Sequence, residues 1–416
     1  MNVLDTLKER GFVHQTTDET ELREMLEHAP VTCYIGYDPT AESLHVGNLV
    51  TIMMLAHLQR AGHRPIAIVG GGTARVGDPS GKTELRKMLT EEQIETNLAG
   101  LREQLARFMR FDESPTGALM IDNADWLLSL KYIDFLRDIG RYFAVNQMIK
   151  AKGYADRLER EQGLSFIEFN YQILQAYDYL VLNKRYGCRI PLGGADKWGN
   201  IVDGVALVRR VEGVAAHAVT VELITTATGD KMGKTADGAV WLDASRTSVF
   251  DFYQYWRNVD DRDIRRFLAL FTFVPIEDVD RLGSLEGKAA SEINAAKETL
   301  ALAVTALVHG EVEATKARDA ARALFAGSGG DVGNVPSTTI ARERLKAGVP
   351  ITDLLVETGL VPSKKEARRK IDERAVAVGD AVVEDPRLSV TDAFVSDGHV
   401  MLRVGKKSFH RVVIGN

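Results

Sequence analysis

Short apolar runs alternate with longer amphipathic stretches along the first two hundred residues. The apolar runs predict strands at 31–38, 65–71, 118–122 and 188–194. Between and after them, the spacing of apolar residues predicts helices at 46–60, 90–110, 164–183 and 196–210. Strands that alternate with helices need crossover connections, which place parallel strands in one sheet with helices on both faces. The pattern therefore predicts an α/β fold in this part of the chain.

The pattern changes after residue 244. Two long amphipathic stretches follow without a strand between them, which predicts an α-helical domain at 245–326. Residues 327–339 are rich in Gly, Ser, Asn and Pro and predict a linker. Residues 340–416 predict short helices followed by short strands, a small α+β domain. We thus expect three domains, at 1–244, 245–326 and 340–416.

The composition is that of an ordinary globular protein. Of the 416 residues, 45% are hydrophobic and 26% are charged. No apolar run reaches the roughly 18 residues of a membrane span, and the first residues lack the apolar core of a signal peptide. We therefore expect a cytoplasmic protein that does not interact with membranes. Cys33 and Cys188 lie among apolar residues and predict buried free thiols. The scattered His residues show no metal-ligand spacing, so we expect no metal site and no structural zinc.

The charge is unevenly distributed. The net charge is −6 for the chain, whereas residues 337–416 hold 14 Lys or Arg and 11 Asp or Glu (14 − 11 = +3). The preceding residues therefore carry −9 (−6 − 3 = −9). An acidic body with a mildly basic tail suggests a small module with its own partner.

Two short motifs suggest chemistry. The stretch HVGN (45–48) follows the predicted strand at 31–38 and lies at the start of the predicted helix at 46–60. Backbone N–H groups at a helix start attract anions. His45 and Asn48 add donors, and Gly47 leaves room for a flat ring. Taken alone, the stretch is also explained as a helix entry in which His45 merely caps the turn.

The second motif is GDKMGKT (229–235), a Gly-flanked loop with two lysines three residues apart. Lys231 and Lys234 in such a loop can stabilise the charge that develops on a departing pyrophosphate. A solvated lysine loop is the alternative for this motif alone.

HVGN and KMGKT resemble the HIGH and KMSKS signatures of class I aminoacyl-tRNA synthetases. Within that class the chain resembles the bacterial tyrosyl-tRNA synthetases, through YIGYDPTAESLHVGN, GDPSGK, YQILQAYDYL and GGADKWGNI in the same order. This resemblance implies a Rossmann-like parallel-sheet catalytic domain, an α-helical anticodon-side domain and a small α+β RNA-binding domain. It implies activation of L-tyrosine with ATP and Mg²⁺, transfer of tyrosine to the 3′ end of tRNA(Tyr), and a homodimer.

The same resemblance assigns the site. Tyr34 and Asp178 would hydrogen-bond to the phenol of tyrosine. Its ammonium group would donate hydrogen bonds to Asp78, Tyr171 and Gln175. Independently of the family, residues 171, 175 and 178 are spaced to share one helix face. The phosphates of ATP would be contacted by Thr40, His45 and Asn48. Its adenine would lie against Gly47, and its ribose would bind Asp196. The rest of the ATP site would comprise Gly36, Asp38 and Gly194, and the cations and hydroxyl around the pyrophosphate would be Lys82, Arg86, Lys231, Lys234 and Thr235.

The tail contains a basic helix face made by Lys364, Lys365, Arg368 and Arg369, which are paired at i, i+4. Such a face suits an RNA backbone, although a charge run is also typical of a solvated surface. The segment and the AVAVGDAVV stretch after it resemble the alpha-L RNA-binding module. We therefore expect these four side chains to bind tRNA.

Several positions depart from the family pattern. Asn48 replaces the second His of HIGH, and Gly233 and Thr235 stand where KMSKS has serines. Pro191 and Lys197 occupy positions where many relatives carry glutamine, so neither is assigned as a substrate ligand. A tryptophan-specific or other class I synthetase, a small-molecule adenylyltransferase and a catalytically silent RNA-binding paralogue are the alternatives.

Overall fold

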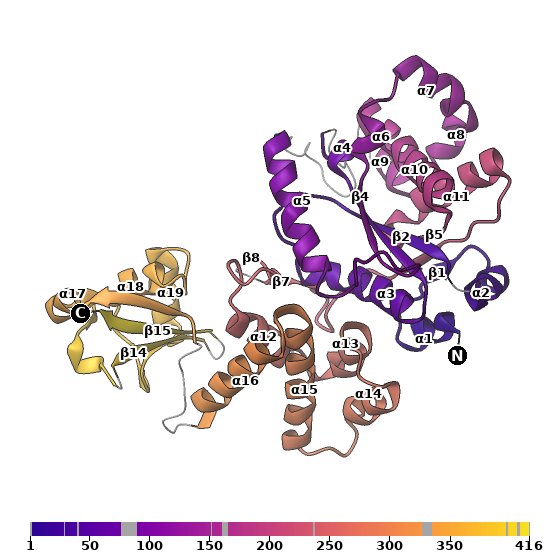
Figure 1. Ribbon diagram of the computed structural model, residues 1–416. Coiled ribbons are helices and arrows are strands. Elements are labelled where there is room, and N and C mark those ends of the chain that lie inside the picture. Colours follow the sequence, from indigo (N-terminus) through magenta and orange to yellow (C-terminus); the bar gives the residue numbers. More distant parts are fainter. Residues whose placement is uncertain are drawn as a thin grey trace. The chain divides into compact units, whose positions relative to one another are not determined.

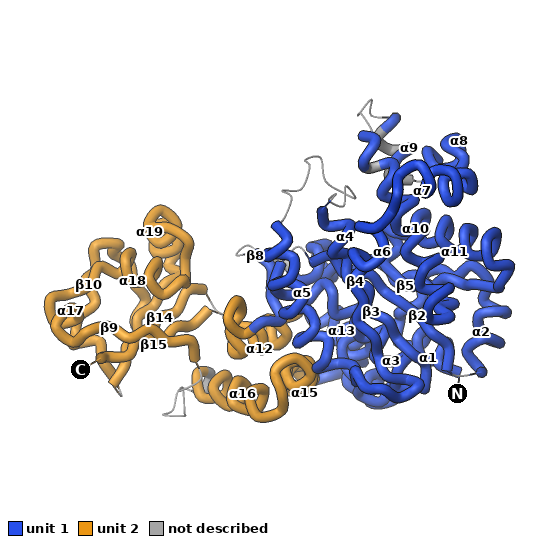
Figure 2. Tube along the Cα trace, turned by 45° about the horizontal axis from the view of Figure 1, so that its top comes forward, with its two compact units in different colours: residues 1–243, 260–288 blue, residues 244–259, 289–416 orange. Residues whose placement is uncertain are grey.

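The computed structural model (Figure 1) describes residues 2–28, 30–39, 41–75, 90–150, 152–159, 165–235, 238–326, 335–396, 398–405 and 408–415. Figure 2 distinguishes two compact units. The first combines residues 1–243 with 260–288, and the second combines 244–259 with 289–416. No described helix is both long and apolar enough to cross a membrane.

A six-stranded sheet forms the centre of the first unit. Its order is β1-β6-β5-β2-β3-β4, with bounds β1 Gln15–Thr16, β2 Thr32–Tyr37, β3 Arg64–Val69, β4 Leu119–Asp122, β5 Cys188–Gly194 and β6 Val219–Val221. All neighbouring pairs are parallel except β1 with β6. The predicted α/β fold and its four strands are therefore confirmed, whereas the short strands β1 and β6 were not predicted.

The chain reverses direction across the sheet at β2. From β2 it passes to β3 and then β4 on one side, whereas β5 and β6 lie on the other side of β2. In open parallel sheets, ligands bind in the crevice outside the carboxyl ends of the strands at such a switch point. The fold therefore places a binding site beyond the ends of β2 and β5.

Helices lie on both sides of this sheet (Figure 1), which explains why β3 is buried from Pro65 to Val69. The helices before β5 are α1 Val3–Glu9, α2 Glu19–Glu27, α3 Leu49–Arg60, α4 Gly71–Ala74, α5 Glu91–Leu105, α6 Ala124–Leu127, α7 Tyr132–Asp138, α8 Val145–Met148, α9 Lys152–Glu159 and α10 Phe166–Tyr186. After β5 comes α11 Trp198–Glu212. Helix α3 contacts β2 and β3, while α10 and α11 contact each other and β5.

Two more helices, α13 Ile264–Phe271 and α14 Ile276–Gly283, belong to the first unit. The helical segment at 245–326 is thus divided differently from the expected domain. Helix α13 contacts α3 and buries Phe267 and Phe271. The buried Arg10 guanidinium donates to the carbonyl oxygens of Ala269, Thr272 and Val274, at 3.0, 3.0 and 2.6 Å. Apolar burial and these three hydrogen bonds tie residues 260–288 to the sheet-containing unit.

In the second unit, α12 Val249–Arg257, α15 Ala290–His309 and α16 Glu311–Ala326 pack on one another. Aromatic side chains of α12, including Tyr253 and Trp256, are buried there. Four alanines of α16 are also buried, at 314, 317, 320 and 321. Small side chains on one helix leave the space that large ones on its neighbour need.

The C-terminal part of this unit has a hydrophobic core of its own, centred on residues such as Leu354, Ile371 and Leu402. A five-stranded sheet runs in the order β12-β11-β14-β15-β9. The strand bounds are β9 Ser337–Ala341, β11 Val376–Val378, β12 Ala381–Val382, β14 His399–Val404 and β15 Ser408–Gly415. The strands β10 Val349–Pro350 and β13 Ser389–Val390 pair separately. The helices are α17 Arg342–Ala347, α18 Ile351–Glu357 and α19 Lys364–Asp372.

The predicted linker at 327–339 extends too far. Residues 337–339 belong to β9, which pairs in parallel with β15 through Thr338 and Val412. These polar residues form a strand because the edge of β15 supplies hydrogen-bond partners distant in sequence. Residues 327–334 lie outside the described part of the chain.

Candidate active site

A cavity of about 420 Å³ opens at the switch point of the large sheet. It is lined by the ends of β2 and β5, by the turn before α3 and by α10. The predicted site residues among its lining are Tyr34, Gly36, Asp38, His45, Gly47, Asn48, Tyr171, Gln175, Asp178, Gly194 and Asp196. Segments distant in the sequence thus converge on one space.

Other predicted residues cannot be placed in this cavity. Thr40, Asp78, Lys82 and Arg86 lie outside the described residues, as do the side chains of Lys234 and Thr235. Lys231 is exposed and is not among the described residues that line the cavity. The assignment of these residues to the pyrophosphate stays a prediction.

Asp178 lines the cavity, and its almost completely buried carboxylate is held by two donors. The Trp126 indole Nε1 donates to Oδ1 at 2.7 Å, and the Asn123 amide donates to Oδ2 at 3.0 Å. Burial raises the pKa of Asp178 to about 7, against the effect of these two hydrogen bonds. Both oxygens keep acceptor capacity for a further hydroxyl donor.

Asn123 is itself fixed by a network. Its Oδ1 accepts from the Gly72 N–H at 2.8 Å, and its amide nitrogen also donates to the Thr73 hydroxyl at 3.1 Å. Sequence reasoning missed Asn123 and Trp126. The available signal was their place directly after β4, at the same sheet edge as the other site residues.

Tyr34 lines the same cavity from β2, with its ring centroid 5.4 Å from that of Tyr179. Burial raises the pKa of the Tyr34 phenol well above its usual value, and the nearby Cys188 and Asp178 add to this shift. Tyr34 therefore stays a neutral hydroxyl that can donate or accept. A hydroxyl and a buried carboxyl group that line one cavity suit a phenolic ligand.

The face of α10 that carries Asp178 also presents Tyr171 and Gln175 to the cavity. Gln175 Oε1 accepts from the Asn200 amide at 2.5 Å, and Asn200 also lines the cavity. This bond fixes the Gln175 amide while one lone pair of its oxygen can still accept. Asn200 was not predicted.

The HVGN turn forms a short 3₁₀ segment, η1 Val46–Asn48, with a reciprocal cap. His45 Nδ1 accepts from the Gly47 N–H at 3.0 Å, and the Asn48 side-chain oxygen accepts from the His45 N–H at 3.1 Å. In a neutral His45 ring the proton therefore lies on Nε2. Because the Asn48 oxygen is occupied by the cap, its amide nitrogen is the donor it can offer to a ligand. The capping alternative and the binding hypothesis are thus compatible.

The lysine-loop backbone packs directly against this turn. A Cβ atom on Gly233 would lie 2.8 Å from the Gly47 nitrogen, and one on Gly47 would lie 3.2 Å from the Met232 carbonyl oxygen. Gly233 also has a φ of 76°, which disfavours any other residue. Glycine in place of the first serine of KMSKS is therefore required by this close approach. Beyond it, β7 Lys234–Thr235 pairs with β8 Gly238–Ala239.

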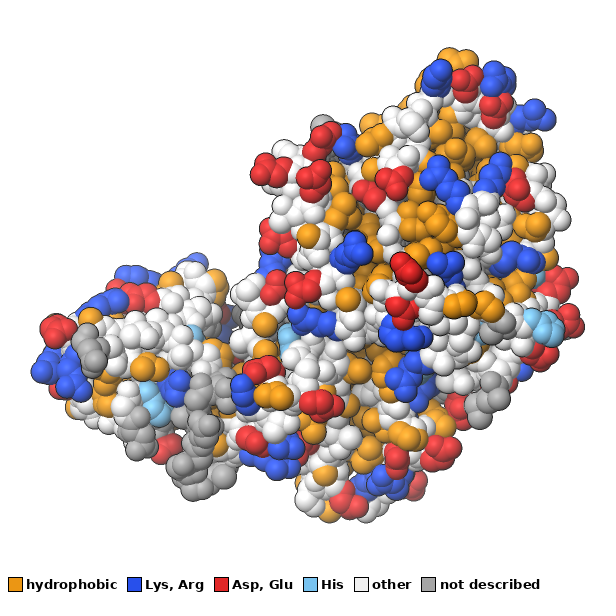
Figure 3. Space-filling view, viewed as in Figure 1, with side chains coloured by type: hydrophobic (Ala, Val, Ile, Leu, Met, Phe, Trp, Pro, Cys, Tyr) orange, Lys and Arg blue, Asp and Glu red, His pale blue; other side chains and the backbone are white. Residues whose placement is uncertain are grey.

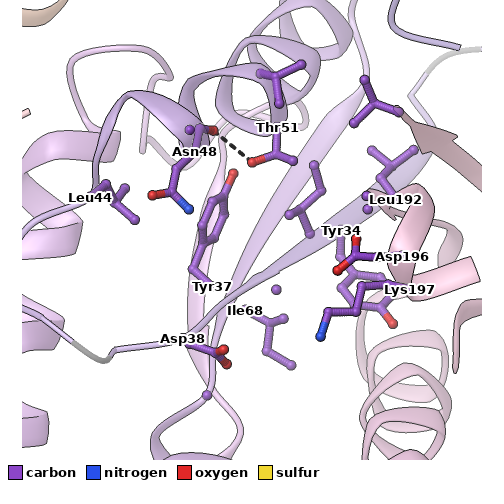
Figure 4. Close-up of a pocket in the computed structure, with 18 of the residues that line it drawn as sticks. Tyr34, Tyr37, Asp38, Leu44, Asn48, Thr51, Ile68, Leu192, Asp196 and Lys197 are labelled. Carbon is purple, nitrogen blue, oxygen red and sulfur yellow. Dashed lines mark hydrogen bonds between the residues drawn. The ribbon is translucent and has the colours of Figure 1, made fainter. Parts of the chain in front are cut away.

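Figure 4 shows two sides of the cavity: on one lie Leu44, Asn48 and Thr51, and on the other Leu192, Asp196 and Lys197. Asp196 and Lys197 belong to η3 Ala195–Lys197, directly after β5. Lys197 is the one Lys or Arg among the described residues that line the cavity. The family pattern gives no reason to assign Lys197 as a substrate ligand, but its place in the cavity wall makes it a candidate. No group of three or more described His, Cys, Asp or Glu side chains is arranged to hold a metal ion.

The predicted RNA-binding residues of α19 are exposed, but only some of their charges are neutralised by a nearby carboxylate. Lys364 pairs with Asp353 at 2.7 Å, and Arg369 pairs with Glu366 at 2.5 Å. Lys365 and Arg368 make no ion pair with another described residue. These two cations are thus better placed to meet an external polyanion.

Comparisons with known proteins agree with this geometry. Residues 26–326 match the family "tRNA synthetases class I (W and Y)", and residues 330–412 match "Tyrosine--tRNA ligase SYY-like C-terminal domain". The chain is 51% identical over 413 residues to a tyrosine–tRNA ligase of Clostridium tetani, and 53% identical over 414 residues to one of Clostridium botulinum. Each match covers 99% of both chains.

Solved structures with the same fold include a C-terminally truncated mitochondrial tyrosyl-tRNA synthetase of Aspergillus nidulans. The TM-score is 0.70 at 29% identity, covering 78% of this chain and 94% of that one. A tryptophanyl-tRNA synthetase of Encephalitozoon cuniculi bound to tryptophan shares the fold at 13% identity, with a TM-score of 0.53 and coverage of 75% and 86%.

Proposed function

The chain belongs to the class I tyrosyl-tRNA synthetases, and we propose from this premise how its residues divide the reaction. The enzyme activates L-tyrosine with ATP to give tyrosyl-adenylate and pyrophosphate, and then transfers tyrosine to tRNA(Tyr). One observation carries the assignment of the site: Tyr34 and Asp178 line the same cavity as the HVGN turn. This shared cavity supports a tyrosine subsite next to a phosphate-binding turn.

Tyrosine is selected by Tyr34 and Asp178 in the cavity. Its phenol would exchange hydrogen bonds with Tyr34 and Asp178, and its ammonium group would donate to Tyr171 and Gln175. Phenylalanine would leave the buried Asp178 carboxyl group without the partner that the site is shaped for, which penalises it strongly. Asp78 is proposed for the ammonium group from the resemblance alone.

Adenylate formation needs donors around the phosphates. The tyrosine carboxylate oxygen attacks the α-phosphorus, the bond from that phosphorus to the β-phosphate oxygen breaks, and the electron pair leaves with pyrophosphate. His45 Nε2–H and the Asn48 amide are proposed to donate to phosphate oxygens, together with Thr40. Lys82, Arg86, Lys231, Lys234 and Thr235 would stabilise the pyrophosphate. Gly36, Asp38, Gly47, Gly194 and Asp196 would surround the rest of ATP.

Magnesium is proposed to enter as part of MgATP. The described residues offer no cage of carboxylates, and a Mg²⁺ ion bound mainly by phosphates and water needs none. A bound Mg²⁺ would neutralise phosphate charge.

For tRNA binding we propose the exposed face of α19, with Lys364, Lys365, Arg368 and Arg369. This role is supported by the match of residues 330–412 to a tyrosine–tRNA ligase C-terminal domain and by the uncompensated charges of Lys365 and Arg368.

We propose that the enzyme works in the cytoplasm. The free, buried cysteines support this location, because thiols stay reduced there.

We also propose a homodimer formed through the first unit. Large apolar side chains are exposed between residues 128 and 167, among them Ile133 at 71% and Phe166 at 67%. Figure 3 shows hydrophobic side chains gathered over α7, α8 and α10. An exposed apolar face of this kind marks a protein interface.

The experiment that tests this function is pyrophosphate exchange into ATP, measured with each of the twenty amino acids. We expect exchange with tyrosine and its collapse in Lys234→Ala. Exchange with tryptophan in place of tyrosine would reassign the substrate, and no exchange with any amino acid would reject the function.

A further inference from the structure

A short antiparallel ladder joins the HVGN turn to the segment that follows the lysine loop. The Val46 N–H donates to the Val240 carbonyl at 2.9 Å, and the Leu242 N–H donates to the Leu44 carbonyl at 2.9 Å. His45 and Trp241 are directly opposite each other in this ladder. The Asp243 N–H adds a bond to the Ser43 hydroxyl at 3.2 Å.

The side chains of His45 and Trp241 meet across the ladder. Their ring centroids are 6.1 Å apart at an interplanar angle of 67°, an edge-to-face arrangement. Both residues line the cavity. Side chains that are directly opposite on two antiparallel strands project from the same face, so the backbone pairing itself brings the two rings together.

The two neighbours of Trp241 in the sequence are more deeply buried than Trp241 itself. Val240 and Leu242 are 6% and 0% exposed and belong to the core, whereas Trp241 is only half-buried and faces the cavity. In an extended segment successive side chains point to opposite sides. The ladder is therefore anchored by Val240 and Leu242, and the indole forms part of the cavity wall.

We propose that Trp241 is a positioning residue for adenylate formation, which acts by holding the His45 imidazole. The Gly47 N–H fixes His45 at Nδ1, and the indole limits rotation of the ring about that bond. Together they fix the orientation of the imidazole whose Nε2–H is proposed to donate to phosphate. The same segment is also bonded to the lysine loop: the Val240 N–H donates to the Gly233 carbonyl oxygen at 2.9 Å. This inference rests on the proposed role of His45 in binding phosphate.

The test compares Trp241→Ala, Trp241→Phe and His45→Ala with the double variant Trp241→Ala/His45→Ala in tyrosine-dependent pyrophosphate exchange. We expect Trp241→Ala to lower kcat about tenfold without changing the dissociation constant for tyrosine, since an edge-to-face pair contributes roughly that much. Trp241→Phe should recover most of the rate. In the His45→Ala background, removing the indole should cost nothing further, because the two residues act as one unit.

Phe273→Ala serves as the control. Phe273 is a half-buried aromatic residue of the same unit, and it is not among the described residues that line the cavity. This variant should lower the melting temperature without changing kcat.

Three results would overturn the inference: full activity of Trp241→Ala, an equal loss in the His45→Ala background, or a raised KM for ATP at unchanged kcat, which would indicate direct contact with the nucleotide. Absence of exchange in the unmodified enzyme would instead reject the proposed function.

Discussion

The Trp126 indole donates a 2.7 Å hydrogen bond to the buried carboxylate of Asp178. Through this bond a residue that need not touch the substrate sets the orientation of the group assigned to the phenol. We therefore expect Trp126→Phe to raise the KM for tyrosine about tenfold, since a hydrogen bond to a charged group contributes ~1.5–3 kcal/mol. It should also reduce the preference for tyrosine over phenylalanine. Exchange kinetics with both amino acids measure this, and Trp198→Phe is the matched control. Unchanged discrimination in Trp126→Phe would refute the positioning role.

The raised pKa of Asp178 predicts how stability depends on pH. The folded-state pKa is about 7 and the ordinary value is 3.8, so the native protein binds this proton more tightly than the unfolded chain. The stabilisation is present below pH 4 and is lost as the pH rises through 7, by up to ~4 kcal/mol. Asp178→Asn lacks this titration. Denaturant unfolding should show that the free energy of unfolding falls more between pH 4 and pH 8 in the unmodified enzyme than in the variant. Equal falls in both proteins would contradict the assignment.

The close approach of Gly233 to Gly47 predicts that the family serine is not tolerated here. Gly233→Ser should lower kcat for exchange about tenfold or more, because both the positive φ and the 2.8 Å approach oppose a Cβ atom. Gly229→Ser is the control, with a φ of 90° and open space around its Cβ position. Strain without collision should leave its kcat near normal. If both variants behave alike, the packing of the two turns is not what requires glycine.

The uncompensated cations of α19 predict a selective effect on tRNA. Lys365→Glu/Arg368→Glu should raise the KM for tRNA at least tenfold and lower the salt-dependence slope by about 2, while exchange stays unchanged. Lys364→Gln/Arg369→Gln should have a smaller effect, because carboxylates already neutralise these residues. Aminoacylation at several salt concentrations decides. Normal tRNA kinetics in the first variant would show that the charge run is only a solvated face.

The exposed apolar face predicts a concentration-dependent dimer. Ile133→Asp should shift the enzyme to monomers in sedimentation velocity, because a buried charge in an apolar interface is costly. Val312→Asp changes an equally exposed residue, 66% against 71%, on α16 of the other unit. It should leave the oligomeric state unaltered. A dimer that persists in Ile133→Asp would place the interface elsewhere.

The sequence by itself determined the alternation of strands and helices, because apolar periodicity is a local property that burial on one or two faces requires. It also determined the shared face of residues 171, 175 and 178, since the helical repeat fixes that spacing. The two signature motifs could be identified from their residue types alone.

Only the tertiary structure decided which partners hold these groups. Asn123 and Trp126 reach Asp178 because β4 and α10 converge at one sheet edge, and Trp241 meets His45 because a ladder joins segments almost two hundred residues apart. Residues 260–288 likewise belong to the first unit through a contact distant in sequence, the hydrogen bond from Arg10 to the Ala269 carbonyl oxygen. Such contacts depend on how distant segments pack, and no local pattern in the chain encodes that packing.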